Sequence, residues 1–195
     1  MNIRYDSENG LREVTLTFND GPHHTLTPRL LDILKSENIK AMFFVLGLNA
    51  AADKNIKIVK RAYEEGHIIG SHSYFHRNLK QLSEYDVRAE ILYSEKLIKD
   101  FLSTPKLFRP PFGAANLRVN QLIWEFGYTI MPWSVDSLDW KDKNNKWVEN
   151  TIQQINKRDD SIVLLHDTYE STINHLPELI NAIKIRQAEN EVVSS

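Results

Sequence analysis

The sequence predicts an α/β protein that forms one distorted, shortened (β/α) barrel as a single domain over residues 1–195. Segments with strand patterns and segments with helical patterns alternate along most of the chain, and this alternation predicts a parallel sheet covered by helices. Polar side chains follow the ends of several strands, as expected where the carboxyl ends of barrel strands meet. The chain has 195 residues, whereas a complete eight-unit barrel typically needs about 250, so the barrel must be shortened.

Six segments have the composition expected of strands. Residues 14–18 (VTLTF) are β-branched and aromatic, and residues 41–47 (AMFFVLG) are an apolar run of buried-strand length. The other strand candidates are HIIGS, LFRPPF, YTIMPWSVD and SIVLLH, at 67–71, 107–112, 128–136 and 161–166. A polar residue lies on, at or just after the end of most of these strands: Asp20, His72, Arg109, Asp139 and His166.

Six helices are expected between and after these strands, at residues 27–37, 54–65, 82–102, 117–126, 147–156 and 176–185. Thr27 and Pro28 have the pattern of an N-cap followed by proline at the first helical position. Ser83 and Asp86 have the spacing of a capping box at the start of the longest helix. Trp124 lies on an amphipathic helix face and is expected in the core.

The composition excludes several classes of partner. A net charge of −2 and a pI near 6.4 argue against nucleic acid or an anionic membrane, because both require a concentrated basic surface. No apolar run reaches transmembrane length, and the N-terminus MNIRYDSENG lacks the apolar core of a signal peptide. We therefore expect a cytoplasmic protein, or an extracellular or cell-envelope protein if a targeting segment has been removed. The absence of cysteine excludes disulfides and thiolate metal ligands.

Two motifs together predict a metal site. In HSYFH, His72 and His76 are four residues apart, so on a helical turn both imidazoles would share one face. Asp20, in TFNDGP, could add a carboxylate oxygen from a neighbouring strand end. Each motif alone is compatible with a chance histidine pair or an ordinary turn. Two imidazoles and one carboxylate describe a catalytic zinc-type site, or the triad of non-haem iron oxygenases, against which the βα alternation counts.

A proline-rich segment, FRPPFG, holds the next candidate. Arg109 could orient a carboxylate within the site, or pair with one on the surface as most arginines do. The two prolines make the segment rigid and Gly113 permits a tight bend, which favours the ordered role. The backbone N–H of Phe112 is a candidate oxyanion donor.

The last two strands supply an acid–base pair. His166 ends IVLLH and is either a satisfied core histidine or a proton donor facing the site. Asp139, in SVDSLDW, could hold the tautomer of that histidine and raise its pKa, and Trp140 beside it could wall an acyl pocket. Asp136 in the same segment is either a turn cap or a site residue. The remaining histidines are expected on the surface or in loops: His23, His24, His67 and His175.

The five segments TFNDGP, HSYFH, RPPFG, DSLDW and LLH occur in this order over residues 14–166, and in this the chain resembles the polysaccharide deacetylases of carbohydrate esterase family 4, also called the NodB homology domain. The resemblance implies a distorted (β/α) barrel that hydrolyses N- or O-acetyl groups from a polysaccharide such as chitin oligomers or peptidoglycan. It also implies one divalent metal ion, zinc in the first place, with cobalt, manganese and nickel as alternatives.

By the same resemblance, Asp20, His72 and His76 would bind the metal, and Arg109 would orient the catalytic base. His166 would be the general acid, and Asp139 would support it. Trp140 and Leu164 would line the pocket for the acetyl methyl, and the N–H of Phe112 would bind the oxyanion.

One residue departs from the family pattern. The first residue of the pair in TFNDGP is normally the aspartate base, and here it is Asn19. An amide does not accept a proton near neutral pH, so we expect a metal-bound but weak hydrolase. Three explanations are compatible with this: an introduced substitution, a natural protein that binds acetylated glycan without hydrolysing it, or residual activity in which His166 shuttles both protons. A hydrolase of small cyclic amides with the same fold is a further alternative.

Overall fold

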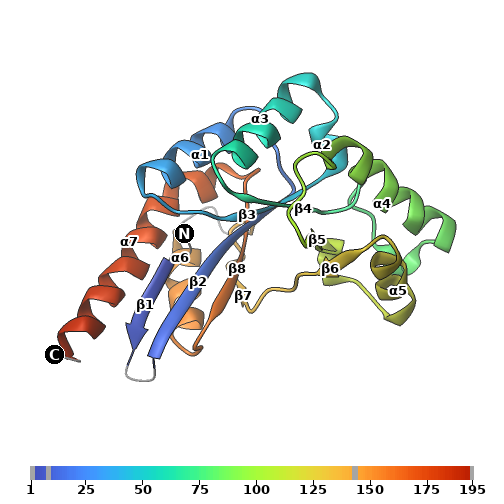
Figure 1. Ribbon diagram of the computed structural model, residues 1–195. Coiled ribbons are helices and arrows are strands. Elements are labelled where there is room, and N and C mark those ends of the chain that lie inside the picture. The colour runs from blue at the N-terminus through green and yellow to red at the C-terminus, as the bar shows by residue number, and fades with distance from the viewer. Residues whose placement is uncertain (1–2, 8–9, 142–144, 194–195) are drawn as a thin grey trace.

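The computed structural model describes residues 3–7, 10–141 and 145–193 (Figure 1). A curled sheet of parallel strands in the order β6-β5-β4-β3-β2-β8-β7 forms its centre, and β1 pairs with β2 antiparallel. The strands are β1 (Ile3–Ser7), β2 (Gly10–Asn19), β3 (Met42–Val45), β4 (Ile68–Ser71), β5 (Lys106–Phe108), β6 (Tyr128–Ile130), β7 (Val135–Asp136) and β8 (Ser161–His166). Within the described ranges β6 and β7 do not pair, so the barrel is open between them. The predicted shortened, distorted (β/α) barrel is confirmed.

Helices cover the outside of the sheet (Figure 1). They are α1 (Leu26–Ser36), α2 (Gly47–Ala50), α3 (Asp53–Glu64), α4 (Glu84–Ile98), α5 (Leu117–Glu125), α6 (Lys146–Ile155) and α7 (Glu170–Val193), with 3-10 turns η1 (Leu79–Gln81) and η2 (Pro111–Gly113). Of the helices so described, none is both long enough and apolar enough to cross a membrane. At the start of α4 Ser83 is the N-cap, and its hydroxyl accepts from the Asp86 N–H at 3.1 Å, as the predicted capping-box spacing requires. The Asp86 carboxylate accepts from the Ser83 hydroxyl at 2.6 Å rather than from the Ser83 N–H, so the box is a variant.

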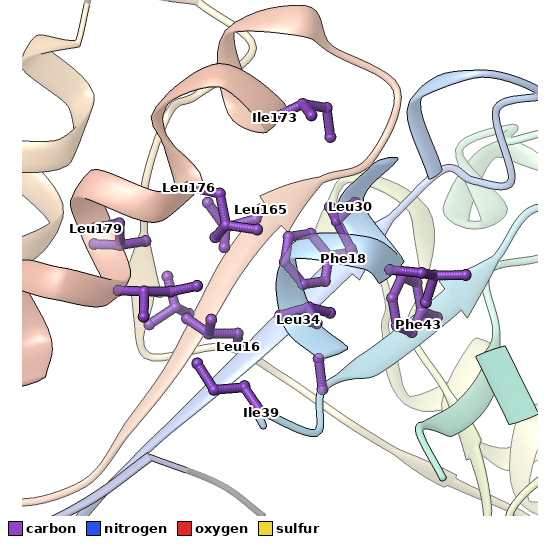
Figure 2. Close-up of a cluster of buried hydrophobic side chains, with 14 of the residues drawn as sticks. Leu16, Phe18, Leu30, Leu34, Ile39, Phe43, Leu165, Ile173, Leu176 and Leu179 are labelled. Carbon is purple, nitrogen blue, oxygen red and sulfur yellow. The ribbon is translucent and has the colours of Figure 1, made fainter. Parts of the chain in front are cut away.

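The main core lies between the sheet and the helices α1 and α7. Figure 2 shows Phe18 and Leu165, from neighbouring strands, facing Leu30 and Leu34 of α1 and Leu176 of α7. Each of these side chains is at most 1% exposed, and burying one such side chain contributes roughly 1.5–3 kcal/mol. This packing fixes the central strands whose carboxyl ends carry the site residues.

One predicted strand is wrong. Residues 128–136 were expected to form a single strand, but they form β6 and β7 at opposite edges of the sheet. Pro132 interrupts the segment, because proline has no N–H for a strand ladder. Residues 131–134 instead cross the open side of the barrel, and Met131 N–H donates to the carbonyl of Phe108 at 2.9 Å while Ser134 N–H donates to that of Ile162 at 3.0 Å.

The predicted N-cap of the first helix is also wrong. The helix α1 begins at Leu26 with Thr25 at the N-cap. The hydroxyl of Thr27 is already engaged, because it accepts from the N–H of His23 at 2.8 Å and donates to Asp167 at 2.6 Å. The last helix, α7, begins at Glu170, earlier than the predicted range of 176–185.

The burial of two side chains differs from the prediction. His67, expected in a loop or on the surface, is 5% exposed, and its Nδ1 accepts from the N–H of Ala41 at 3.1 Å. Burial, with the charge of Lys40, lowers the pKa of His67 to about 4. Trp124, expected in the core, is 53% exposed on α5. Amphipathic spacing alone did not fix which face of this short helix packs inward.

Candidate metal and acid–base site

The site is built where parallel strands end side by side. Asn19 is the last residue of β2 and lies opposite His166, the last residue of β8. His72 follows β4, and Arg109 follows β5 rather than lying on it. A cavity of about 400 Å³ opens there, and its lining comprises Asn19, Asp20, His72, His76, Phe112, Trp133, Asp136, Trp140, Leu164, His166 and Tyr169. Every predicted site residue lines this cavity except Arg109 and Asp139, which are buried beside it.

Asp20, His72 and His76 converge on one point. The Oδ1 atom of Asp20 is 3.4 Å from Nε2 of His72 and 3.4 Å from Nε2 of His76. This oxygen is buried and has no hydrogen-bond partner in the described part of the chain. A buried acceptor left without a donor, beside two imidazoles, suits a divalent cation.

His72 is prepared as a neutral ligand. Its Nδ1–H donates to the carbonyl oxygen of Arg109 at 2.6 Å, which leaves the lone pair on Nε2 facing Asp20. Complete burial and the neighbouring His76 lower the pKa of His72 well below its ordinary value. A backbone carbonyl that fixes the tautomer of an imidazole is the usual support of a metal-binding histidine.

The HSYFH segment has a different conformation from the predicted helical turn. Ser73 and His76 have φ values of 67° and 60°, so the loop turns through left-handed residues between the two imidazoles. The rings of His72 and His76 nevertheless meet, with centroids 5.1 Å apart. The two histidines share one site as predicted, but a left-handed loop brings them together instead of a helical turn.

The amide of Asn19 has a defined orientation. Its Oδ1 accepts from the guanidinium of Arg109 at 3.0 Å, and its Nδ2 lies 3.3 Å from Nε2 of His72. A guanidinium only donates hydrogen bonds, so the amide oxygen must face Arg109. The NH₂ group therefore faces the metal-ligand side, where it can donate a hydrogen bond but cannot take a proton.

Arg109 is fully buried and spans the open side of the barrel. Its guanidinium donates to the carbonyls of Met131 at 3.0 Å and Pro132 at 3.1 Å, and to the hydroxyl of Thr17 at 2.7 Å. It lies 4.0 Å from the centre of the Phe44 ring. Burial lowers the pKa of Arg109 to about 9, and no carboxylate in the described ranges forms an ion pair with it. Asn19 thus leaves a buried cation without an anionic partner.

His166 and Asp139 form a buried pair. The imidazole Nδ1–H donates to Oδ1 of Asp139 at 2.8 Å. The other carboxylate oxygen accepts from the His166 N–H at 2.8 Å and from the hydroxyl of Thr172 at 2.6 Å, which holds the carboxylate in place. Burial acts to lower the pKa of His166, but the hydrogen bond and the charge of Asp139 outweigh burial and raise it. The arrangement suits a histidine that holds and then donates a proton.

Predicted and unpredicted residues form the cavity walls. Trp140 is half exposed and Leu164 is buried, and both line the cavity as predicted. Two aromatic residues that the sequence did not reveal lie beside them. Tyr169 packs edge-on against His166 with ring centroids 5.8 Å apart, and Trp133 fills the space beside η2. Both are aromatic residues close to a strand end, and that position was the only signal in the sequence. Asp136 both caps a turn, accepting from an N–H at 3.1 Å, and lines the cavity.

A buried carboxyl group supports the turn that carries Asp20. Asp167 lies under Gly21, where a β-carbon would come within 2.0 Å of its Oδ2. The hydroxyl of Thr27 donates to that oxygen at 2.6 Å, while Oδ1 has no partner among the described residues. Burial raises the pKa of Asp167 to about 7. The group is therefore protonated in the folded protein at pH values where the unfolded chain has already lost the proton.

Replacing Asp167 with asparagine is expected to stabilise the protein at pH 8 but not at pH 4. The unfolded carboxyl ionises near pH 4 and the folded one near pH 7, so ionisation favours unfolding progressively between these values. The stability difference between Asp167→Asn and the unchanged chain should rise by on the order of 3–4 kcal/mol over this window. Urea unfolding from pH 4 to pH 8 with a chelator present measures it. Asp100→Asn, at an exposed position, is the control, and a pH-independent difference for Asp167→Asn would contradict the prediction.

Known proteins resemble this chain in sequence and in fold. Residues 6–131 match the family model described as Polysaccharide deacetylase. A peptidoglycan-N-acetylglucosamine deacetylase of Bacillus cereus is 39% identical over 90% of this chain, which spans 65% of that protein's length. The chitin deacetylase of Colletotrichum lindemuthianum has a similar structure, with a TM-score of 0.80 and 30% identity over 89% of this chain and 82% of its own.

A further similar structure is of a protein called a carbohydrate esterase family 4 pseudoenzyme, from Bacillus anthracis. It has a TM-score of 0.75 and 29% identity, over 89% of this chain and 60% of that one. A mutant of the same protein is described as having restored enzymatic activity. The family model, the relatives and the folds agree, and the chain belongs to the polysaccharide deacetylases of carbohydrate esterase family 4.

Proposed function

We propose that the chain is a metal-dependent glycan deacetylase domain whose hydrolytic step is impaired by Asn19, so that it binds acetylated glycan and releases little acetate. The observation that carries the proposal is one cavity that holds the Asp20, His72 and His76 cluster beside the His166 pair, with an amide in the position of the base. Apart from that base, the features needed for acetyl hydrolysis are present.

The names of the relatives support an N-acetylated glycan of the peptidoglycan or chitin class as the ligand. A peptidoglycan ligand would require the protein to reach the cell envelope. The pseudoenzyme among the similar structures supports impaired catalysis, because it shows that this family includes inactive members. Zinc is the proposed ion, since two imidazoles and one carboxylate with open positions are typical of catalytic zinc.

The residues of the chain divide the chemistry between them. A divalent ion held by Asp20, His72 and His76 would polarise the acetyl carbonyl and lower the pKa of a nearby water. As water adds to the carbonyl carbon and the C–N bond breaks, the leaving amine needs a proton. His166 supplies that proton, because Asp139 keeps the imidazole oriented and raises its pKa. This half of the reaction is intact.

The other half lacks its acceptor. The attacking water must give up a proton, and the group that faces it in this cavity is the NH₂ of Asn19. That group donates to oxygen, so it can bind a water or a substrate carbonyl without accepting the proton. Trp140 and Leu164 form an apolar wall for the acetyl methyl, and Phe112, which has a positive φ, lines the same cavity. Binding is therefore retained where turnover is weak.

Metal removal tests this proposal. We expect the zinc-loaded chain to bind N-acetylated chitotetraose, and peptidoglycan fragments, more tightly than the chelated chain, with acetate release near background. His76→Ala should weaken zinc binding by more than the roughly 10–100-fold typical of changes outside the ligand shell. Because His76 is partly exposed, this variant should fold. Isothermal titration calorimetry measures both affinities.

The control variant is His175→Ala, which removes an imidazole on α7 outside the cavity. Oligomers of glucosamine, which lack the acetyl group, are the ligand control. Equal binding of acetylated and deacetylated oligomers, with no dependence on metal, would contradict the proposed function.

A further inference from the structure

A buried carboxylate on α4 holds the loop that carries the two histidines. Glu90 has a side chain with 0% exposure. Its Oε2 accepts from the backbone N–H groups of Tyr74 and Phe75, each at 2.8 Å, and its Oε1 accepts from Nε of Arg77 at 2.6 Å. The carboxylate thus makes three hydrogen bonds, one to each of three residues within the segment 74–77, and it does not line the candidate cavity. Bonds to a charged group of this kind are about twice as strong as neutral ones.

The same loop is held from its other side by α2. The N–H of Gly47 donates to the carbonyl of Ser73, and the N–H of Leu48 donates to that of Tyr74, each at 2.9 Å. A β-carbon on Gly47 would come within 2.6 Å of the Tyr74 ring. The loop is therefore fixed between α2, which binds its carbonyls, and Glu90, which binds its N–H groups.

The loop needs such support because its backbone is strained. Ser73 and His76 are non-glycine residues with positive φ, and residues in that region persist only where their surroundings hold them. The two histidines differ in how else they are held. His72 has its ring fixed by the carbonyl of Arg109 and its N–H by that of Val45. His76 lacks a comparable backbone bond to its ring: its N–H lies 3.3 Å from the Ser73 hydroxyl, and its ring contacts those of Phe112 and His72.

We propose that Glu90 is a positioning residue for the metal site, and that it acts chiefly through His76. Its carboxylate fixes the loop so that the imidazole of His76 faces Asp20 before an ion is bound. The inference rests on the proposed metal-dependent function, since it concerns the affinity of that site. A purely structural role would tie α4 to the loop and neutralise Arg77, and it would affect stability without affecting metal affinity.

The experiment is a double-mutant cycle on zinc affinity, measured by competition with a chelating indicator. We expect Glu90→Gln to weaken zinc binding roughly 10–100-fold, the usual effect of a residue that orients a ligand. In the His76→Ala background the same substitution should change the affinity by no more than about twofold, because the ligand on which Glu90 acts is absent. The visible absorption of the cobalt-loaded protein should also change in Glu90→Gln, since it reports ligand geometry.

Glu95→Gln is the matched control, because Glu95 lies on the same helix and pairs with Lys106 at 2.9 Å away from the loop. The inference would be overturned if Glu90→Gln lowered stability without changing zinc affinity. An equal loss of zinc affinity with and without His76 would overturn it too. If Glu90→Gln does not fold, Gly47→Ala displaces the same loop from the α2 side, and an unchanged zinc affinity there would overturn it as well. Failure of the unchanged chain to bind zinc would instead reject the proposed function.

Discussion

Replacing Asn19 with aspartate is expected to raise the rate of acetate release from acetylated glycans by roughly 10²–10⁴-fold, the usual contribution of a general base. Arg109 would bind one carboxylate oxygen, as it now binds the amide oxygen at 3.0 Å. The second oxygen would take the place of the NH₂ group beside His72 and could accept a proton from water. No other residue has to move for the acceptor to be supplied.

The measurement compares acetate release from chitotetraose and peptidoglycan fragments by the two zinc-loaded forms. Asn116→Asp is the matched control, because it makes the same chemical change at the N-cap of α5, outside the cavity. Both forms are first checked for zinc and glycan binding. If both bind and Asn19→Asp still releases no more acetate than the unchanged chain, the proposed deacetylase activity is wrong, and a glycan-binding role or another substrate class becomes the better explanation.

Replacing Asp139 with asparagine in the Asn19→Asp background is expected to lower acetate release at pH 8 by about 10²–10⁴-fold, the range for loss of an acid. The active form of His166 carries the proton, so activity is present below its pKa and is lost as pH rises through it. Asp139 raises that pKa against the effect of burial. Without the carboxylate the effect of burial is opposed only by the weaker effects of Asp20 and Asp167, and the pKa of His166 falls. The alkaline limit of the pH profile should therefore move to lower pH.

The substitution also changes the tautomer of His166. In the present structure the imidazole Nδ1–H donates to Oδ1 of Asp139. An asparagine whose oxygen kept the bonds from Thr172 and the His166 N–H would present its NH₂ group to Nδ1, and the imidazole would have to accept. Asp136→Asn is the control, because Asp136 lines the same cavity without bonding His166. An alkaline limit that does not move in Asp139→Asn would exclude His166 as the acid.

The alternation of strands and helices accounts both for the fold and for several of the residues that meet at the site. The alternation of strands and helices predicted a parallel sheet, and parallel strands deliver their carboxyl ends to one face. Asn19 and His166 end neighbouring strands in register, so their proximity follows from the fold alone. His72 and His76 were predicted to meet on a helical turn, and they meet because the loop turns through left-handed residues instead.

Local backbone conformation and contacts between distant segments were harder to predict from the sequence. The positive φ of Ser73 is not a preference of serine. The loop that contains it is bonded by α2 and by Glu90, a residue of α4 that no local pattern connects with the loop. The strand pattern at 128–136 could not show that the segment crosses the open side of the barrel, because that depends on where the sheet ends. Trp133, which precedes β7, and Tyr169, which follows β8, line the same cavity only in the folded protein.

The buried guanidinium of Arg109 has a consequence for how this protein can evolve. It connects the central strand β2 with residues 131–132, which belong to the segment that crosses the gap between the barrel edges, and it also fixes the group at position 19. Selection for folding alone would therefore preserve Arg109 in a lineage that no longer hydrolyses its ligand. Such a lineage would keep the guanidinium that binds a carboxylate at position 19, and a single replacement there by aspartate would restore the catalytic base.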